Sequence, residues 1–324
     1  MKKKMFVSVL CLSLIVSLCG GVGAAAAESE DERSRAVDVL VASGWSEEDI
    51  NDLIPEEALL EYANAYPAMA SEEVYLKVGV DDAGETVVEE IDKTTCIAEA
   101  TAVKEQREIA IQQELSGVSS YTDKDSVTTD DGYLKYYVQA AQSTTNSNEY
   151  ILSARYEWIV EPEDRDIDVF GLGHSAQLDQ TDSDVYYRYK CEIYMLTGGQ
   201  KMLVDRHEVD EPTAMCIDNG GTAVSQDLYN NSSGMGYVSK AENHRGYIQY
   251  RAEVNSTSAT RVSVFAEYLH QEAVFSVSPS VSYPLGASIS VSSEEKFVRM
   301  SPNPYLSFRA VSYTHLTLPT ICSV

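Results

Sequence analysis

Basic residues are scarce in this chain of 324 residues, which has 24 Lys and Arg against 51 Asp and Glu and a net charge of −27. Nucleic acids and anionic lipid surfaces are bound by basic protein surfaces. The composition therefore excludes nucleic acid as an expected partner and argues against docking on a membrane. The excess of acidic residues favours solubility outside the cell, with divalent-cation binding as the alternative.

Cysteine is also scarce, and none of the six cysteines forms a Cys-x-x-Cys pair or a Cys/His metal-ligand spacing. A structural zinc site is therefore not expected. Three of the cysteines lie in the two terminal segments discussed next, which leaves Cys96, Cys191 and Cys216. Cys191 and Cys216 both lie in apolar, strand-like runs, so we expect either a disulfide between them across neighbouring strands or two buried free thiols.

Long apolar runs are absent except for Met5 to Val16. This run follows three lysines and precedes small residues that end at Ala27, a pattern typical of a secretory signal peptide and too short for a stop-transfer helix. We expect residues 1–27 to be removed, the source to be bacterial, and the protein to be secreted or located in the cell envelope. Without the three lysines, 21 basic residues remain against 51 acidic ones, a net charge of about −30.

The last residues resemble translated sequencing-adapter DNA rather than protein sequence. Val311 to Thr320 reads VSYTHLTLPT, which is the translation of a transposase adapter used to prepare sequencing libraries. We interpret residues 311–324 as an adapter-derived artefact, expect the gene to be interrupted near Ala310, and exclude this segment from fold reasoning. The rest of the chain resembles no protein family.

Residues 28–70 are expected to form a small helical N-terminal region. Gly44 ends one helix, Ser46 caps the next and Pro55 precedes a third. Because short amphipathic helices cannot bury their apolar stripes alone, we expect them to pack on the rest of the chain or on a partner. Residues 71–131 follow with a strand–turn–strand unit, a helix of about twenty residues from Thr95 and a polar linker.

Residues 132–310 change to a period of two, in which apolar and polar side chains alternate. The expected strands lie near residues 134–140, 152–160, 185–195, 248–254 and 262–268, with tight turns at Gly198-Gly199 and Asn219-Gly220. One apolar and one charged face per strand indicates an antiparallel sheet. The predicted fold class is α+β and mainly β: an antiparallel β-sandwich-like domain preceded by a small helical N-terminal region.

Tyrosine is common, with 21 in the chain. Some tyrosines fall on the polar phase of the expected strands, where they can stack on sugar rings or anchor a protein partner. The alternative is that sheet faces near the edges of a sandwich simply tolerate tyrosine. The candidate contact residues are Tyr186, Tyr194 and Tyr247.

Two acidic loops are candidates for calcium binding, because calcium prefers several oxygen ligands from flexible loops. Neither loop has the register of an EF-hand, and solvated acidic loops are the alternative. The candidate ligands are Asp164, Asp166, Asp168, Asp179, Asp182 and Asp184. No other cofactor is expected.

Gly173-His174-Ser175-Ala176-Gln177 differs from the hydrolase nucleophile elbow because Gln177 stands where glycine is required. A loop between two strands is the expected structure there, and the four histidines between residues 174 and 270 have no fixed metal-ligand spacing.

Residues 275–291 alternate apolar residues with serine. This pattern predicts a hairpin with Tyr283 paired with Ala287, and it resembles, in pattern only, the inserting hairpins of aerolysin-like and other β-pore-forming proteins.

The sequence thus predicts a non-catalytic extracellular binding or envelope-associated protein with a glycan or protein partner. A membrane-acting hairpin protein and a secreted hydrolase are the alternatives.

Overall fold

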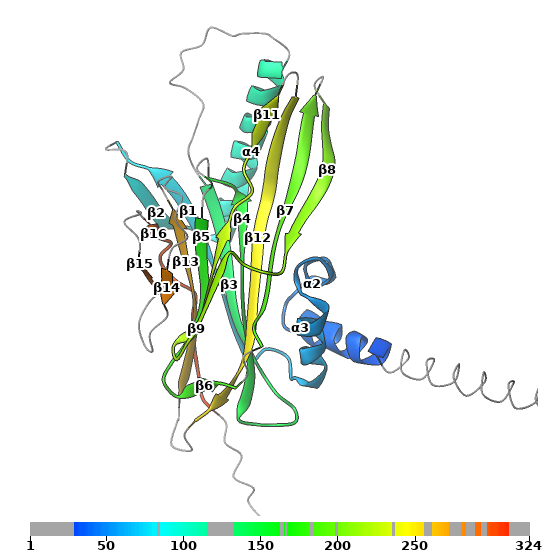
Figure 1. Ribbon diagram of the computed structural model, residues 1–324, viewed down its shortest axis with the longest axis vertical. Helices are drawn as coiled ribbons and strands as arrows, with labels where there is room; N and C mark the ends of the chain where they lie inside the picture. Colours follow the sequence, from blue (N-terminus) through cyan, green and yellow to red (C-terminus); the bar gives the residue numbers. More distant parts are fainter. Residues whose placement is uncertain are drawn as a thin grey trace, which may run out of the picture.

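Two antiparallel β-sheets stack face to face and form most of the molecule (Figure 1). The computed structural model describes residues 29–82, 85–115, 132–162, 165, 167–181, 184–197, 200–234, 237–255, 261–271, 280–282, 289–292 and 297–310. The expected fold class, mainly β with a sandwich and a few N-terminal helices, is confirmed. The predicted signal peptide and the predicted adapter-derived tail lie outside the described residues.

The larger sheet has nine strands within the described part of the chain, all paired antiparallel. Its strands, in spatial order, are β2 (Thr86–Glu90), β1 (Ala70–Val80), β3 (Gly132–Gln142), β4 (Glu149–Val160), β12 (Tyr237–Val254), β7 (Tyr186–Thr197) and β8 (Gln200–Val209), with β6 (Leu178–Gln180) and β11 (Ser232–Gly234) also paired to β12. The turn expected at residues 219–220 connects β9 to β10, whereas the turn expected at residues 198–199 lies outside the described residues.

The smaller sheet has six strands among the described residues, and a separate hairpin has two. The six are, in spatial order, β16 (Phe297–Arg299), β13 (Val262–Gln271), β5 (Ile167–His174), β10 (Gly221–Asp227) and β9 (Ala214–Asp218), with β17 (Tyr305–Phe308) paired to β13. The separate hairpin is formed by β14 (Ser280–Ser282) and β15 (Ser290–Ser292).

The apolar phase of the strands lies between the two sheets and forms the main core. Aromatic side chains fill much of this space, and Tyr156, Trp158 and Tyr268 are fully buried in edge-to-face contact. Trp158 Nε1 donates a hydrogen bond to the Tyr268 hydroxyl at 2.9 Å. The apolar side chains that alternate along each strand thus lie on the face that is buried in the core, as the sequence pattern predicted.

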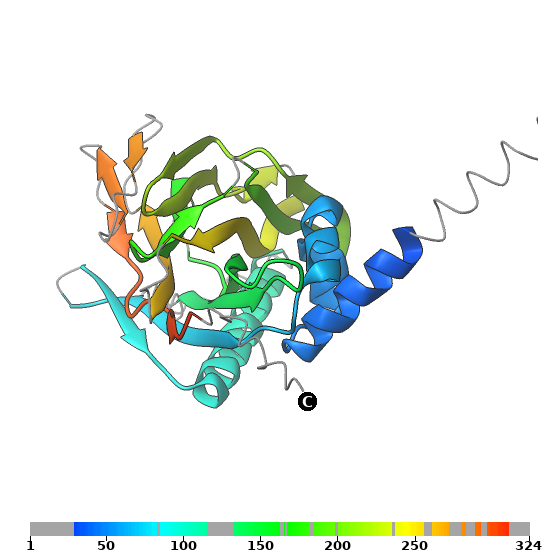
Figure 2. The same cartoon turned by 90° about the horizontal axis from the view of Figure 1, so that it is seen from below.

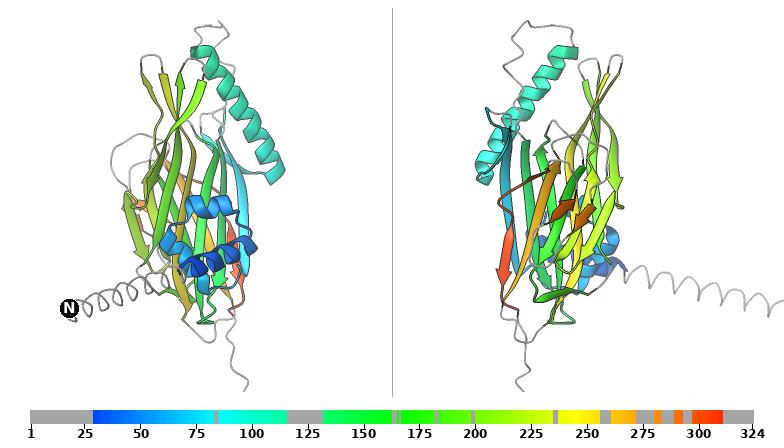
Figure 3. Two further views of the ribbon diagram at one scale, coloured as in Figure 1. Left: turned by 90° about the vertical axis from the view of Figure 1, so that its right-hand side faces the viewer. Right: turned by 60° about the vertical axis from the view of Figure 1, so that its left-hand side comes forward.

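Helices cover the outer face of the nine-stranded sheet (Figures 2 and 3). The N-terminal group consists of a helix over residues 29–42, α2 (Glu47–Leu53), α3 (Glu56–Glu61) and the 3₁₀ turn η1 (Tyr62–Asn64). The long helix α4 (Lys93–Leu115) runs obliquely toward the other end of the sheet. It packs Cys96, Ala100 and Val103 against β1, β3 and β4.

The N-terminal helices end where the sequence indicated. Gly44 has a φ of +94°, a left-handed conformation that glycine adopts without strain, and the Ser46 side chain accepts a hydrogen bond from the Asp49 amide. The apolar stripe of these helices packs on Tyr137, Ile151 and other residues of the sheet. The expectation that the stripe would be buried against the rest of the chain is confirmed.

Beneath the N-terminal helices, the polar side chains of the strands do not face solvent. This corrects the expectation that the polar face of these strands is exposed. Gln139, Ser153 and Gln249 are 0% exposed beneath the N-terminal helices. Trp45 Nε1 donates to Gln139 Oε1 at 2.9 Å, and the Gln249 side-chain amide donates to the Ala58 carbonyl at 3.2 Å. These polar side chains are buried because helical side chains and backbone satisfy their hydrogen bonds.

The hairpin of β14 and β15 forms with a register two residues away from the predicted one. Ser282 pairs with Ser290, whereas a Tyr283–Ala287 pair would have placed it opposite Ser288. The pairing is therefore shifted by two residues, while the parity of the alternation is kept. Residues 283–288 themselves lie outside the described residues.

No helix in the described part of the chain combines the length and apolar character needed to span a bilayer.

Candidate functional site

The three candidate tyrosines occupy different environments on the nine-stranded sheet. Tyr247 is 0% exposed, with its ring 5.9 Å from that of Trp45, so its assignment to an exposed contact surface is wrong. Tyr186 is half-buried and packs against the N-terminal helices. Tyr194 is half-buried at the far end of β7, where α4 rather than the N-terminal group lies nearby.

The candidate calcium ligands are not brought together among the described residues. Asp168 is 2% exposed, and its carboxylate accepts hydrogen bonds from the Tyr268 hydroxyl and contacts His270 Nδ1 at 2.7 Å. Asp179 accepts a hydrogen bond from the Asn255 side chain at 2.9 Å, and Asp184 is exposed. Asp164, Asp166 and Asp182 lie outside the described residues. Within the described part, no group of three or more His, Cys, Asp or Glu side chains is arranged to hold a metal ion.

The predicted disulfide between Cys191 and Cys216 is not formed, because the two residues lie on different sheets. Cys191 on β7 pairs with His207 of β8, whereas Cys216 on β9 pairs with Ala223 of β10. All three cysteines of the described chain are free thiols, and Cys96 and Cys191 are buried. The alternation identified both segments as strands but carried no information about which sheet each joins.

Ser175 lies in the connection between β5 and β6, as expected for a loop between strands. Its hydroxyl accepts a hydrogen bond from the Ser263 amide at 3.1 Å, and the neighbouring His174 ring contacts the Ser175 carbonyl rather than the hydroxyl. No strand-to-helix turn follows, so the geometry of a nucleophile elbow is not present at this serine.

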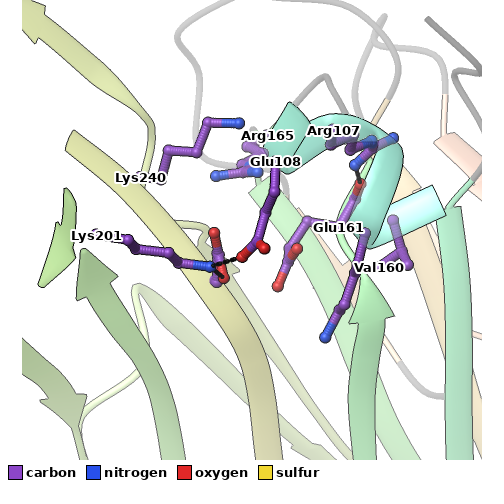
Figure 4. A pocket seen from close by; sticks show the side chains of 9 residues that line it. Arg107, Glu108, Val160, Glu161, Arg165, Lys201 and Lys240 are labelled. Carbon is purple, nitrogen blue, oxygen red and sulfur yellow. Dashed lines mark hydrogen bonds and ion pairs between the residues drawn. The ribbon is translucent and has the colours of Figure 1, made fainter. Parts of the chain in front are cut away.

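A charged pocket opens on the outer face of the nine-stranded sheet, between the second half of α4, the end of β4 and side chains of β8 and β12 (Figure 4). It contains about 430 Å³ of space free of atoms, including space open to solvent. Five cationic and three acidic side chains line it, together with Val160. These charged residues are Lys104, Arg107, Glu108, Glu161, Arg165, Lys201, Lys240 and Glu242.

Hydrogen bonds from several elements fix the floor of the pocket. Arg165 is 8% exposed and donates to the Ala241 carbonyl at 2.8 Å and to the Asn231 side chain at 2.6 Å. Glu161 is 4% exposed and accepts a hydrogen bond from the Asn243 amide. Asn243 sits in a β-bulge of β12 with a φ of +58°, a conformation that asparagine tolerates, and the bulge turns its amide toward Glu161.

The rim of the pocket is formed by side chains from α4 and the sheet (Figure 4). Lys201 of β8 forms ion pairs with Glu108 of α4 at 2.8 Å and with Glu242 of β12 at 2.9 Å. Arg107 donates to the Glu161 carbonyl at 2.9 Å. Within the described chain, the side-chain ammonium groups of Lys104 and Lys240 form no hydrogen bond or ion pair, although the charges of Glu161 and Glu242, respectively, act on them at longer range.

Burial sets the electrostatics of the site. Burial raises the pKa of Glu161, although the Arg165 charge beside it acts in the opposite direction. Burial also lowers the pKa of Lys240, and the carboxylate of Glu242 opposes that shift. Each shift disfavours the charged form, so an anion that entered the pocket would stabilise the lysine charge that burial now penalises.

Sequence reasoning missed this pocket because its residues come from five separate segments between positions 104 and 242. One local signal was present: Lys104 and Arg107 are three residues apart and therefore share one face of α4. Nothing in the sequence indicated that this face would meet Lys240 and Arg165.

Comparisons with known proteins find no matching family model and no matching curated protein. Among solved structures, the chain is similar to the collagen-binding domain from a Staphylococcus aureus adhesin, with 8% identity and a TM-score of 0.27 over 54% of this chain and 96% of that one. It is also similar to the collagen binding domain of Erysipelothrix rhusiopathiae surface protein RspB, with 5% identity and a TM-score of 0.23 over 55% of this chain and 66% of that one. Likenesses at these TM-scores carry no argument about the ligand of this chain.

Proposed function

We propose that this chain is a non-catalytic binding protein that acts outside the cytoplasm and binds an anionic group in the charged pocket. The observation that carries the proposal is the local excess of cations in a protein with a net charge of −27. Two of those cations, Lys104 and Lys240, form no hydrogen bond or ion pair through their side chains within the described chain. An anion beside either lysine gains a charge-assisted hydrogen bond that the lysine does not make at present.

The charges of the lining residues support binding of an anion, because five of the eight charged side chains are cationic. The two buried charged groups of the pocket are held by backbone hydrogen bonds: Glu161 accepts one from the Asn243 amide, and Arg165 donates to the carbonyls of Ala241 and Pro162. A location outside the cytoplasm rests on the predicted signal peptide.

Sulfate tests the proposal directly. Thermal unfolding is measured with sodium sulfate and with sodium chloride at equal ionic strength, for the unaltered protein, Lys240→Ala and Lys93→Ala. Lys93 is the first residue of α4 and lies far from the pocket, so its variant is a control matched in charge. We expect a saturable stabilisation by sulfate that is lost in Lys240→Ala and retained in Lys93→Ala, because a ligand that binds only the folded state raises its stability.

Sulfate also strengthens folding in general by exclusion from protein surfaces, and that effect acts on all three proteins alike. Equal and unsaturating stabilisation of the three proteins would therefore show that the pocket does not bind anions.

A further inference from the structure

Tyr194 and the charged pocket form one continuous surface on the outer face of the nine-stranded sheet. Tyr194 pairs directly with Lys240 across β7 and β12. On its other side, Lys201 Nζ lies 4.7 Å from the centre of the Tyr194 ring. An aromatic ring that is half exposed thus stands beside two cations of the pocket.

Hydrogen-bonding side chains extend this surface along β7. The Tyr194 hydroxyl donates to Glu192 Oε2 at 2.6 Å, and the Asn243 side-chain amide donates to the same oxygen at 2.8 Å. Arg206 of β8 lies 3.5 Å from Glu192 and keeps 63% of its side chain exposed. Burial and the hydrogen bond to Glu192 raise the pKa of Tyr194 to about 12, so its ring remains neutral.

The surface extends along β7 from the contact with α2 at one end to the contact with α4 at the other. Lys190 donates to the Asp52 carbonyl of α2 at 2.7 Å, while Lys201, next to Tyr194, is paired with Glu108 of α4. Position 194 lies four residue steps beyond position 190 along β7, which corresponds to roughly 13 Å of extended strand. The outer face between α2 and α4 is therefore longer than a single anionic group.

We infer that the ligand is an acidic polysaccharide, whose carboxylate or sulfate enters the pocket while a neighbouring sugar ring lies against Tyr194; this inference rests on the proposed function. The tyrosine ring supplies a flat apolar area for the C–H face of the sugar. Glu192, Asn243 and Arg206 supply the few polar groups that fix the orientation of hydroxyls. The pocket supplies the charge selectivity.

An acidic peptide fits this surface less well because the backbone beneath it is already paired. β7 lies between β12 and β8, and β12 lies between β4 and β7, so neither strand offers an open edge. Peptides that add to sheets gain affinity from main-chain hydrogen bonds at such an edge. At β7 and β12 only side chains are available to a ligand, and the edge of the sheet in the described chain is at β8, one strand away from Tyr194.

Apart from the acidic side chains of the pocket and Glu192, the negative charges of the protein oppose a polyanion only at long range. At an ionic strength of about 0.15 M, exposed charges farther apart than about 8 Å are largely screened. The cations of the pocket contact the ligand within that distance, so they dominate binding under these conditions.

The test uses the full chain and four probes at this ionic strength: a heparin octasaccharide, a neutral dextran oligosaccharide of similar length, an oligoglutamate peptide and inorganic sulfate. Affinities are measured by isothermal titration calorimetry for the unaltered protein, Tyr194→Ala, Lys240→Ala and the control Tyr66→Ala. Tyr66 is 55% exposed and lies away from the pocket, next to the start of β1. Circular dichroism of each variant establishes that it is folded.

We expect heparin to bind and dextran not to bind. Tyr194→Ala is expected to weaken heparin binding roughly three- to tenfold and to leave sulfate binding unchanged, whereas Lys240→Ala weakens both. Tyr66→Ala is expected to change neither. Oligoglutamate binding that equals heparin binding and ignores Tyr194→Ala would overturn the inference while leaving the proposed function intact. Failure of every anion, sulfate included, would overturn both.

Discussion

The carboxylate of Asp52 in α2 lies 2.8 Å from the guanidinium Nε of Arg245 in β12, 193 positions later in the chain. The same carboxylate lies 3.1 Å from Lys190 Nζ of β7. One acidic residue of the N-terminal helices thus contacts two neighbouring strands of the nine-stranded sheet. Together with Asp49–Arg155 at 2.9 Å and the Glu61–Arg251 pair, it attaches the helical cover to the sheet.

Removing the charge of Asp52 should loosen this cover. We expect Asp52→Asn to lower the free energy of unfolding by about 1–3 kcal/mol, because two cations lose their charged hydrogen-bond partner. Limited proteolysis should then cut the N-terminal helices faster than in the unaltered protein. Asp38→Asn is the control, since Asp38 is exposed on the first helix. Equal cleavage rates in all three proteins would show that this ion pair does not hold the helices.

The same carboxylate should give the docking a specific pH dependence. Burial raises the pKa of Asp52, but the hydrogen bonds and charges of Arg245 and Lys190 outweigh burial and lower it overall. The unfolded chain therefore binds this proton more readily than the folded one. The stability contributed by Asp52 is present above the ordinary aspartate pKa of about 3.9 and is lost as the pH falls through the lowered folded value.

Fluorescence of Trp45 in a Trp158→Phe background, followed during acid titration, measures this transition. The Asp52→Asn variant should lack this component, and an unchanged titration in that variant would argue against the assignment.

A buried hydroxyl should contribute to the helix–sheet interface through hydrogen bonding alone. The Tyr62 hydroxyl donates to Ser153 Oγ and accepts from the Gln139 side-chain amide, each at 3.0 Å, and all three residues are fully buried. Tyr62→Phe removes only this oxygen and leaves two buried polar groups without that partner. We expect a loss of about 1–3 kcal/mol in urea unfolding. The exposed Tyr66 provides the control, and Tyr66→Phe should be neutral. A neutral Tyr62→Phe would mean that the interface rearranges around the missing oxygen.

The thiols should differ in reactivity. Burial raises the pKa values of Cys96 and Cys191 to about 11, whereas Cys216 is partly exposed on an edge strand. Because thiolates are the reactive form, we expect a maleimide to label Cys216 rapidly in the folded protein and the other two only after unfolding. Peptide mapping by mass spectrometry identifies the labelled sites. A peptide in which Cys191 and Cys216 are joined by a disulfide would contradict this arrangement of the strands.

Asp168 should act as a core residue rather than as a calcium ligand. Its carboxylate is bonded to Tyr268 and His270, and Gln271 also donates to it from the backbone at 3.4 Å. We expect Asp168→Asn to lower the free energy of unfolding by about 2–3 kcal/mol, by the same amount with excess calcium and with a chelator. Asp184→Asn, at an exposed aspartate of the second acidic loop, serves as the comparison. A loss that appears only in the presence of calcium would restore Asp168 as a metal ligand.

Several elements could be predicted because their signals are local. The alternation of residues 134–140 and 152–160 follows directly from the geometry of a strand whose two faces meet different environments. Gly44 and Ser46 act within a single turn of chain, so their effects on the helix ends do not depend on the rest of the fold. The hairpin of β14 and β15 was predicted with the right parity but with a register two residues away, because alternation with a period of two does not distinguish registers that differ by two residues.

The candidate site could not be predicted for the opposite reason. Tyr194 was identified as a contact residue from its position on the polar phase of β7, and Tyr247 was identified by the same reasoning. The structure leaves Tyr194 half-exposed beside Lys240 and buries Tyr247 under Trp45. The difference depends on where the helices pack on the sheet, and the sequence of neither strand indicates that position.

By itself, the sequence determined the secondary structure and the face of each strand that turns toward the main core, because both depend on side chains within a few residues of one another. Only the tertiary structure decided whether the other face meets water, a helix or a ligand. That outcome depends on contacts between residues far apart in the chain, such as Asp52 with Arg245 and Lys201 with Glu108. These contacts form only after the folded sheets have brought the residues together.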